Sequence, residues 1–121
     1  MAQLFLTKAL TDQLIKNGKA QEQARQNELD SINFKPVVKF FNPCGAGTWL
    51  ISEIDANDPD LMFGLCDLGM GCAELGMVSI TELKSVRLRF GLKIERDYRF
   101  KADKTLSEYS NAAYESGRIN A

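Results

Sequence analysis

Carboxylates are the most numerous chemically active side chains in the middle of this chain. Residues 40–83 contain seven acidic side chains and no basic one, whereas residues 1–39 have six basic and four acidic side chains and residues 84–121 have nine and five. A surface of one charge sign attracts partners of the opposite sign. We therefore expect another protein as the partner, bound by residues of the acidic turns and the glycine-rich loop between them: Asp58, Asp60, Asp67, Met70 and Glu74.

The same carboxylates have two other interpretations. Asp58 and Asp60 flank a proline, which is typical of turns, and Glu82 stands where a helix-capping motif needs an acid. A pair of carboxyl groups can also bind a hard cation or serve as acid and base. No local ligand motif fixes such a geometry here, so a metal or catalytic function is the weaker hypothesis.

Three cysteines, Cys44, Cys66 and Cys72, are the other candidates for chemistry. An odd number cannot form a fully paired disulfide framework, and we expect free thiols. As weak metal-site candidates they need a fourth ligand such as Asp67, and their spacing lacks the paired Cys-x-x-Cys of zinc sites. The chain has no histidine, which excludes Ser-His-Asp and Cys-His catalysis. We therefore expect no cofactor.

Nucleic-acid binding is an alternative suggested by the last third of the chain. Its basic residues are interleaved with aromatic ones, as in surfaces that bind phosphates and stack on bases. However, residues 92–101 alternate like a strand, which puts Tyr98 and Phe100 on one face and Arg99 on the other with Glu95. Arg96 breaks the alternation, so it either pairs with Asp67 or Glu53 or lies near a strand end. Nucleic acid is thus the less favoured partner.

Composition predicts one domain over residues 1–121. Of the 121 residues, 45% are hydrophobic and 26% are charged, and the net charge is −1, as in soluble globular proteins. We divide the domain into a helical amino-terminal segment, residues 1–31, and a core of residues 32–121. The amino end has no basic residue before its apolar stretch, and no segment is long enough for a membrane span. A cytoplasmic location without a membrane partner is expected.

The first half of the chain predicts a helix followed by three strands. Leucines four residues apart form one helix face after Thr7, and Asn17-Gly18 is interpreted as its end. Residues 19–30 are then either a weakly docked second helix or a solvated connector. Strands are predicted over residues 34–41, 48–54 and 61–68, joined by turns rich in proline, glycine and aspartate.

The second half predicts a glycine loop over residues 69–76, then a helix, a strand and a last helix. Ser79 and Thr105 each begin a capping motif, the second of which opens a helix that ends at Gly117. The half-buried strand covers residues 92–101. The fold class is α+β, with an antiparallel sheet of four or five strands, a meander of hairpins, and helices packed on one face.

Four blocks of sequence resemble a known bacterial family. They are V-V-K-F-F-N-P, T-W-L-I-S-E-I-D, F-G-L-C-D-L-G-M-G-C-A-E-L-G-M-V-S-I-T-E-L and G-L-K-I-E-R-D-Y-R-F. Together they cover about residues 35–110 and resemble the family known as domain of unknown function 2958. The family usually has a proline where this chain has Ala73. The resemblance implies a small single-domain protein of the kind carried on plasmids, integrative elements and phages.

The function expected from these observations is that of a non-enzymatic, protein-binding accessory factor of a mobile genetic element. Inhibition of a host defence complex is one mode of action that the resemblance suggests. The alternatives are a small carboxylate- or cysteine-dependent enzyme, and a nucleic-acid-binding protein that uses the basic carboxyl-terminal third.

Weak binding to DNA is the first testable expectation. The acidic third repels phosphates, and acids on the predicted strand offset its basic side chains, so duplex and single-stranded DNA should bind only non-specifically. An anisotropy titration at physiological salt measures this. Sub-micromolar affinity with a steep dependence on salt would contradict it.

Overall fold

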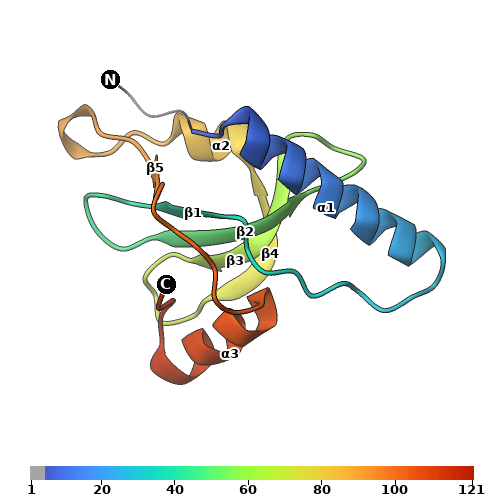
Figure 1. The fold of residues 1–121 in the computed structure, drawn as a ribbon. Coiled ribbons are helices and arrows are strands. Elements are labelled where there is room, and N and C mark those ends of the chain that lie inside the picture. Colours follow the sequence, from blue (N-terminus) through green and yellow to red (C-terminus); the bar gives the residue numbers. More distant parts are fainter. Residues whose placement is uncertain (1–4) are drawn as a thin grey trace.

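Five antiparallel strands form the centre of the computed structural model, which describes residues 5–121 (Figure 1). Their order across the sheet is β4-β3-β2-β1-β5, so the first four strands are consecutive neighbours in a meander, as predicted. The α+β class and the antiparallel sheet are confirmed. The strands are β1 (Val38–Phe41), β2 (Thr48–Ile54), β3 (Leu61–Asp67), β4 (Glu74–Ser79) and β5 (Glu95–Arg96), and the helices are α1 (Lys8–Gln26), α2 (Ile80–Ser85) and α3 (Leu106–Ser116).

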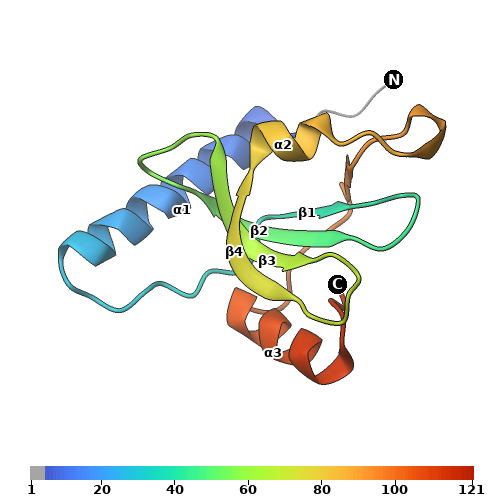
Figure 2. The same ribbon diagram turned by 180° about the vertical axis from the view of Figure 1, so that it is seen from behind.

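Helices cover both faces of the sheet, which corrects the prediction of helices on one face. α1 and α2 lie on one side of the strands and α3 lies on the other (Figures 1 and 2). Successive residues of a strand point to opposite faces. Accordingly, Ile51 packs in a core cluster with Leu14 of α1, while the preceding Leu50 packs in a second cluster with Tyr109 of α3. Both faces of β2 are apolar, so each needs a cover.

α1 is one continuous helix, so the prediction that it ends at Asn17-Gly18 is wrong. Its beginning is as predicted, because the Thr7 hydroxyl accepts a hydrogen bond from the N–H of Leu10. Gly18 is a contact residue rather than a helix terminator. A Cβ atom there would lie 1.7 Å from the carbonyl oxygen of Ile54, so only glycine lets the helix approach β2 this closely.

A β-bulge in β2 lies directly under this contact. The pairing with β3 shifts between Ile51, which is opposite Gly64, and Glu53, which is opposite Phe63. The extra residue is Ser52, and its carbonyl oxygen accepts a hydrogen bond of 2.9 Å from the side-chain amide of Asn17. A one-residue insertion reverses the faces of the residues that follow it. The bulge therefore puts Ile54 under α1 and turns Glu53 to the face of α3.

The long strand predicted over residues 92–101 is wrong, and only Glu95–Arg96 form a strand. This two-residue β5 pairs with Phe40 and Phe41, at the end of the four-residue β1, so it has little edge to pair with. A 3-10 helix (Arg89–Gly91) precedes it, in which the exposed Phe90 has a left-handed φ of 60°. By contrast, part of the predicted glycine loop belongs to β4.

The remaining elements are close to their predictions, except that β1 begins at Val38 rather than at the predicted residue 34. The Ser79 hydroxyl caps α2, and Thr105 and Glu108 form the capping box of α3, which ends at the left-handed Gly117. Strand β2 has the predicted bounds. Among the helices of residues 5–121, none is both long and apolar enough to cross a membrane.

Replacing Gly18 by alanine tests the contact between α1 and β2. In an exposed helix interior a glycine-to-alanine change stabilises the folded protein by about 1 kcal/mol, because glycine is the poorer helix former. Here the added methyl group would overlap the Ile54 carbonyl, so we expect Gly18→Ala to destabilise by roughly 2–4 kcal/mol. Urea unfolding measures the difference. Gly76→Ala, where a Cβ has no neighbour within 4 Å, is the control and should cost little.

Candidate functional site: a cleft that contains Glu53

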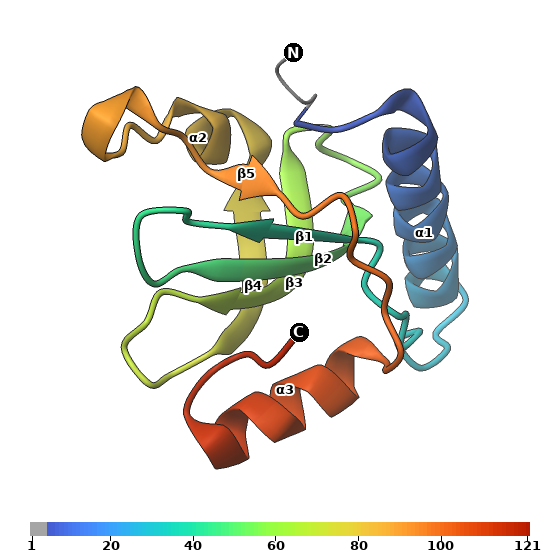
Figure 3. The same ribbon diagram turned by 60° about the vertical axis from the view of Figure 1, so that its left-hand side comes forward.

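An open cleft of about 350 Å³ lies where α1, the segment that follows it and α3 meet the sheet. Its lining includes residues 31–34 of the segment after α1, residues of β2, β3 and β4, and Leu106 and Ser107 at the start of α3. Figure 3 shows how α1, this segment and α3 are placed around the sheet. The walls are mainly apolar. They include Ile32, Phe63, Leu75, Met77 and Leu106.

Glu53 is the buried acidic residue of this cleft, with only 7% of its surface exposed, and Asp55 is a second acid in the lining. Two neutral donors reach its carboxylate, namely the Gln21 amide and the Ser52 hydroxyl, each at 3.3 Å. Burial raises the pKa of Glu53 above its usual range, and the negative charge of Asp55 also raises it, while the two hydrogen bonds act in the opposite direction.

Gln21 fastens the segment after α1 to the cleft. Its side-chain oxygen accepts from the N–H of Ile32 at 2.8 Å, and its side-chain nitrogen donates to the carbonyl oxygen of Ile32 at 3.0 Å. The same nitrogen donates to Glu53. One amide thus joins helix, segment and carboxylate.

The other end of this segment is held by α3. The Asn33 amide donates to the Ser107 hydroxyl at 2.7 Å and accepts from the Ser107 N–H at 3.2 Å. The N–H of Leu106 donates to the carbonyl oxygen of Phe34 at 2.8 Å. The cleft therefore has fixed walls on both sides.

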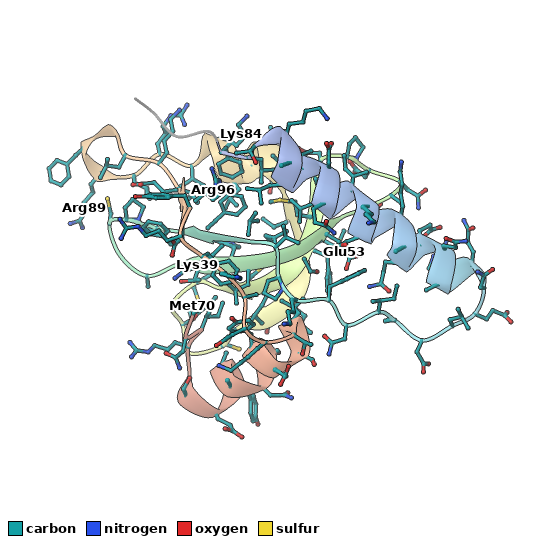
Figure 4. All side chains as sticks on the ribbon, in the orientation of Figure 1. Lys39, Glu53, Met70, Lys84, Arg89 and Arg96 are labelled. Carbon is teal, nitrogen blue, oxygen red and sulfur yellow. The ribbon has the colours of Figure 1, made fainter. Side chains whose placement is uncertain are left out.

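No basic side chain among residues 5–121 forms an ion pair with Glu53. Arg25 lies in the adjoining hollow but forms a salt bridge with Glu22 instead. Figure 4 shows Lys84, Arg89 and Arg96 around α2 and the segment that follows it, away from Glu53. A buried carboxylate with an elevated pKa can accept a proton or a cation, and either property suits a binding or catalytic site.

Asp58 and Asp60, two of the predicted partner residues, lie in the turn before β3. The Asp58 carboxylate accepts from the N–H of Asp60. Asp60 accepts hydrogen bonds from the hydroxyls of Ser79 and Thr81 and from the N–H of Thr81, and these bonds lower its pKa. Both carboxylates thus stabilise local structure, as the turn interpretation proposed.

The other three predicted partner residues lie at the opposite end of β3. Asp67 is buried and accepts from the N–H groups of Gly69 and Ile119, whereas Met70 and Glu74 are exposed. β3 has seven residues, which corresponds to roughly 20 Å between the two groups. The structure does not gather the five residues in one place, and their contact with a partner stays a prediction.

The three cysteines are free thiols that differ in solvent exposure. Cys44 and Cys72 are exposed, and burial raises the pKa of the half-buried Cys66 thiol, which makes it less reactive. Within residues 5–121, no group of three or more cysteine and carboxylate side chains is arranged to hold a metal ion.

Sequence reasoning did not single out Glu53 as a site residue, although the sequence contained a signal. Glu53 interrupts the apolar run of β2, and a charge inside a strand that is otherwise buried needs a special environment. Gln21, Ile32, Leu75 and Met77 carried no such signal, because their role depends on how α1 and β4 are placed.

Comparison with known proteins identifies a family. The model of the family described as "Protein of unknown function (DUF2958)" matches residues 5–120. No curated protein and no solved structure matches the chain.

The raised pKa of Glu53 predicts a pH dependence of stability. The folded state binds the proton more tightly than the unfolded state, so this group's stabilising contribution is full below the ordinary glutamate pKa and is lost as pH rises through the raised value. The stability of the wild type relative to Glu53→Gln should therefore fall as the pH rises through and above the ordinary glutamate pKa. Urea unfolding of both proteins from below to above that pKa measures it, and parallel pH curves would show the idea to be wrong.

Proposed function

Because the chain belongs to the DUF2958 family, whose description assigns no activity, we propose its function from the geometry: it is a non-enzymatic protein that binds an extended, basic segment of another protein. The segment adds to the sheet at β4. The observation that carries this proposal is the exposed, apolar edge that β4 presents beside the cleft.

β4 has six residues and is an edge strand, because β3 is its one neighbour among the strands of residues 5–121. Leu75 and Met77 are each 47% exposed on it. Edge strands of monomeric proteins commonly carry lysine, proline or a covering element, because an open edge pairs with other chains. β4 contains neither lysine nor proline, whereas the opposite edge, β5, is only two residues long.

The backbone N–H and C=O groups of Leu75 and Met77 lie in the plane of the sheet and point to the side of β4 opposite β3. The N–H of Ile80 donates to the carbonyl oxygen of Asp60, next to β3, at 2.8 Å. In an antiparallel pair, alternate residues point their N–H and C=O groups to the partner strand and away from it. Residues 74, 76 and 78 therefore face β3, and residues 75 and 77 can bind an added strand.

Charge favours a basic segment. Antiparallel pairing places Ser79 opposite Leu61 and Glu74 opposite Cys66, so the turn with Asp58 and Asp60 lies at one end of β4. Glu74 begins the strand at its other end, after the loop with Met70. Asp58 and Asp60 therefore lie near one end of this edge and Glu74 near the other, and residues 40–83 contain no basic side chain to oppose a basic partner.

A place on a mobile genetic element and inhibition of a host defence complex remain part of the proposal. They come from the sequence resemblance alone. Binding at the β4 edge is compatible with inhibition. A segment of the target protein that pairs with β4 is no longer available for its normal contacts.

A carboxylate enzyme is the second candidate, and the elevated pKa of Glu53 favours it. Catalysis of this kind needs a second acid, base or nucleophile in reach of the substrate. Among residues 5–121, the hydroxyl bonded to Glu53 is that of Ser52, whose single proton is shared between Glu53 and the Phe63 carbonyl oxygen and whose side chain is almost fully buried. Binding therefore accounts for the geometry better than catalysis.

Substitution of Met77 by lysine tests the edge. A lysine on an edge strand disfavours pairing with another chain, so capture of the partner from host lysate should fall at least about tenfold, with an almost unchanged unfolding temperature. Tyr114→Lys is the matched control, since Tyr114 is 90% exposed on α3, and it should retain capture.

A photo-crosslinking amino acid at position 77 identifies what occupies the edge. We expect crosslinks to an extended segment of a different protein. Full capture by folded Met77→Lys, or crosslinks only to a second copy of this chain, would contradict the proposal.

A further inference from the structure

We propose that the Glu53 cleft is a recognition pocket for one arginine side chain of the segment bound at β4. The inference rests on the proposed function for the source of the arginine, but the chemistry of the pocket is testable without it. It specifies which side chain of the basic segment this protein would recognise.

The first argument is the unmet charge of Glu53. The residue is more than nine-tenths buried, and its described hydrogen-bond donors, Gln21 and Ser52, are neutral. A buried ionised carboxylate is stabilised most by a cation that also donates hydrogen bonds. Asp55 lines the same cleft and adds negative charge, which a cation would offset as well.

The second argument is the shape and polarity of the pocket. Its volume of about 350 Å³ lies within the range of small-ligand sites. Phe63, Leu75 and Met77 form apolar walls, which suit the aliphatic stem of an arginine, and the buried Glu53 carboxylate in the same lining would bind the guanidinium. Arginine fits this arrangement better than lysine, because its planar group can bind a carboxylate through two parallel hydrogen bonds.

The third argument is the connection to the edge. Leu75 and Met77 belong both to the exposed edge of β4 and to the wall of the cleft. Met77 lies opposite Phe63, and Phe63 lies opposite Glu53, so these three residues cross the sheet on one face. A strand added at β4 would place alternate side chains on this face, three interstrand spacings or roughly 14 Å from β2. Only a long side chain that lies along the cleft, over Met77 and Phe63, could bring its end group to Glu53, which again favours arginine.

Titration with a small arginine compound tests the pocket independently of the edge. The probe is N-acetyl-arginine methylamide, and the matched probe is N-acetyl-citrulline methylamide, which has nearly the same shape without the charge. Backbone amide shifts in NMR spectra report where each probe binds and how tightly. We expect the arginine probe to shift residues around the cleft and to bind about tenfold more tightly than the citrulline probe.

Two variants assign the preference to Glu53. Glu53→Gln should abolish it, while Glu115→Gln, which removes an exposed carboxylate near the end of α3, should retain it. Equal affinities of the two probes, or shifts confined to the turn of residues 55–60, would overturn the inference. If the preference is present but Met77→Lys does not weaken partner capture, the pocket stands and the edge proposal fails.

Discussion

The contact between α1 and the bulge of β2 determines how the rest of the structure is arranged. Asn17 supplies the hydrogen bond that the Ser52 carbonyl lacks within the sheet, and Gly18 lets the helix approach to the distance at which this bond forms. A buried carbonyl without a partner costs about 1–3 kcal/mol, so helix and bulge stabilise each other. The same contact fixes the face on which Glu53 lies, and thereby creates an acidic cleft rather than a buried charge under α1.

The region around the cleft has an open strand edge and a buried carboxylate to which the described residues supply no cation, and both are unusual in folded proteins. Within residues 5–121, no strand pairs with the outer edge of β4, and Glu53 has no cation partner. The edge and the cleft lie side by side, joined by Leu75 and Met77, which belong to both. An extended segment with a basic side chain would pair with the edge of β4 and also supply a cation to Glu53. We therefore interpret the edge and the cleft as one binding surface. The acidic turns at the two ends of β4 extend the same charge preference outward.

Most of the fold could be predicted from the sequence because its signals are local. The β2 strand, the caps at Ser79 and Thr105 and the end of α3 at Gly117 depend only on neighbouring residues. Asn17-Gly18 was misinterpreted because the same dipeptide ends a helix in one setting and packs against a strand in another. The alternation of residues 92–101 predicted a long strand, but the neighbouring β1 is only four residues long and leaves most of this segment without a strand to pair with. Glu53 was missed because a bulge, which the sequence does not mark, decides which face it occupies.

The separation along the chain of the residues that build the cleft has a consequence for the order of folding. The hairpins of the meander join neighbouring segments, whereas the bond from Asn17 to Ser52 closes a span of 35 residues. Long-range contacts form later than local ones, because more chain entropy must be lost before they stabilise the fold. We expect the four-stranded meander to form first and α1 to dock onto it afterwards. The cleft would then be the last part of the molecule to assemble and the first to open in a local unfolding event.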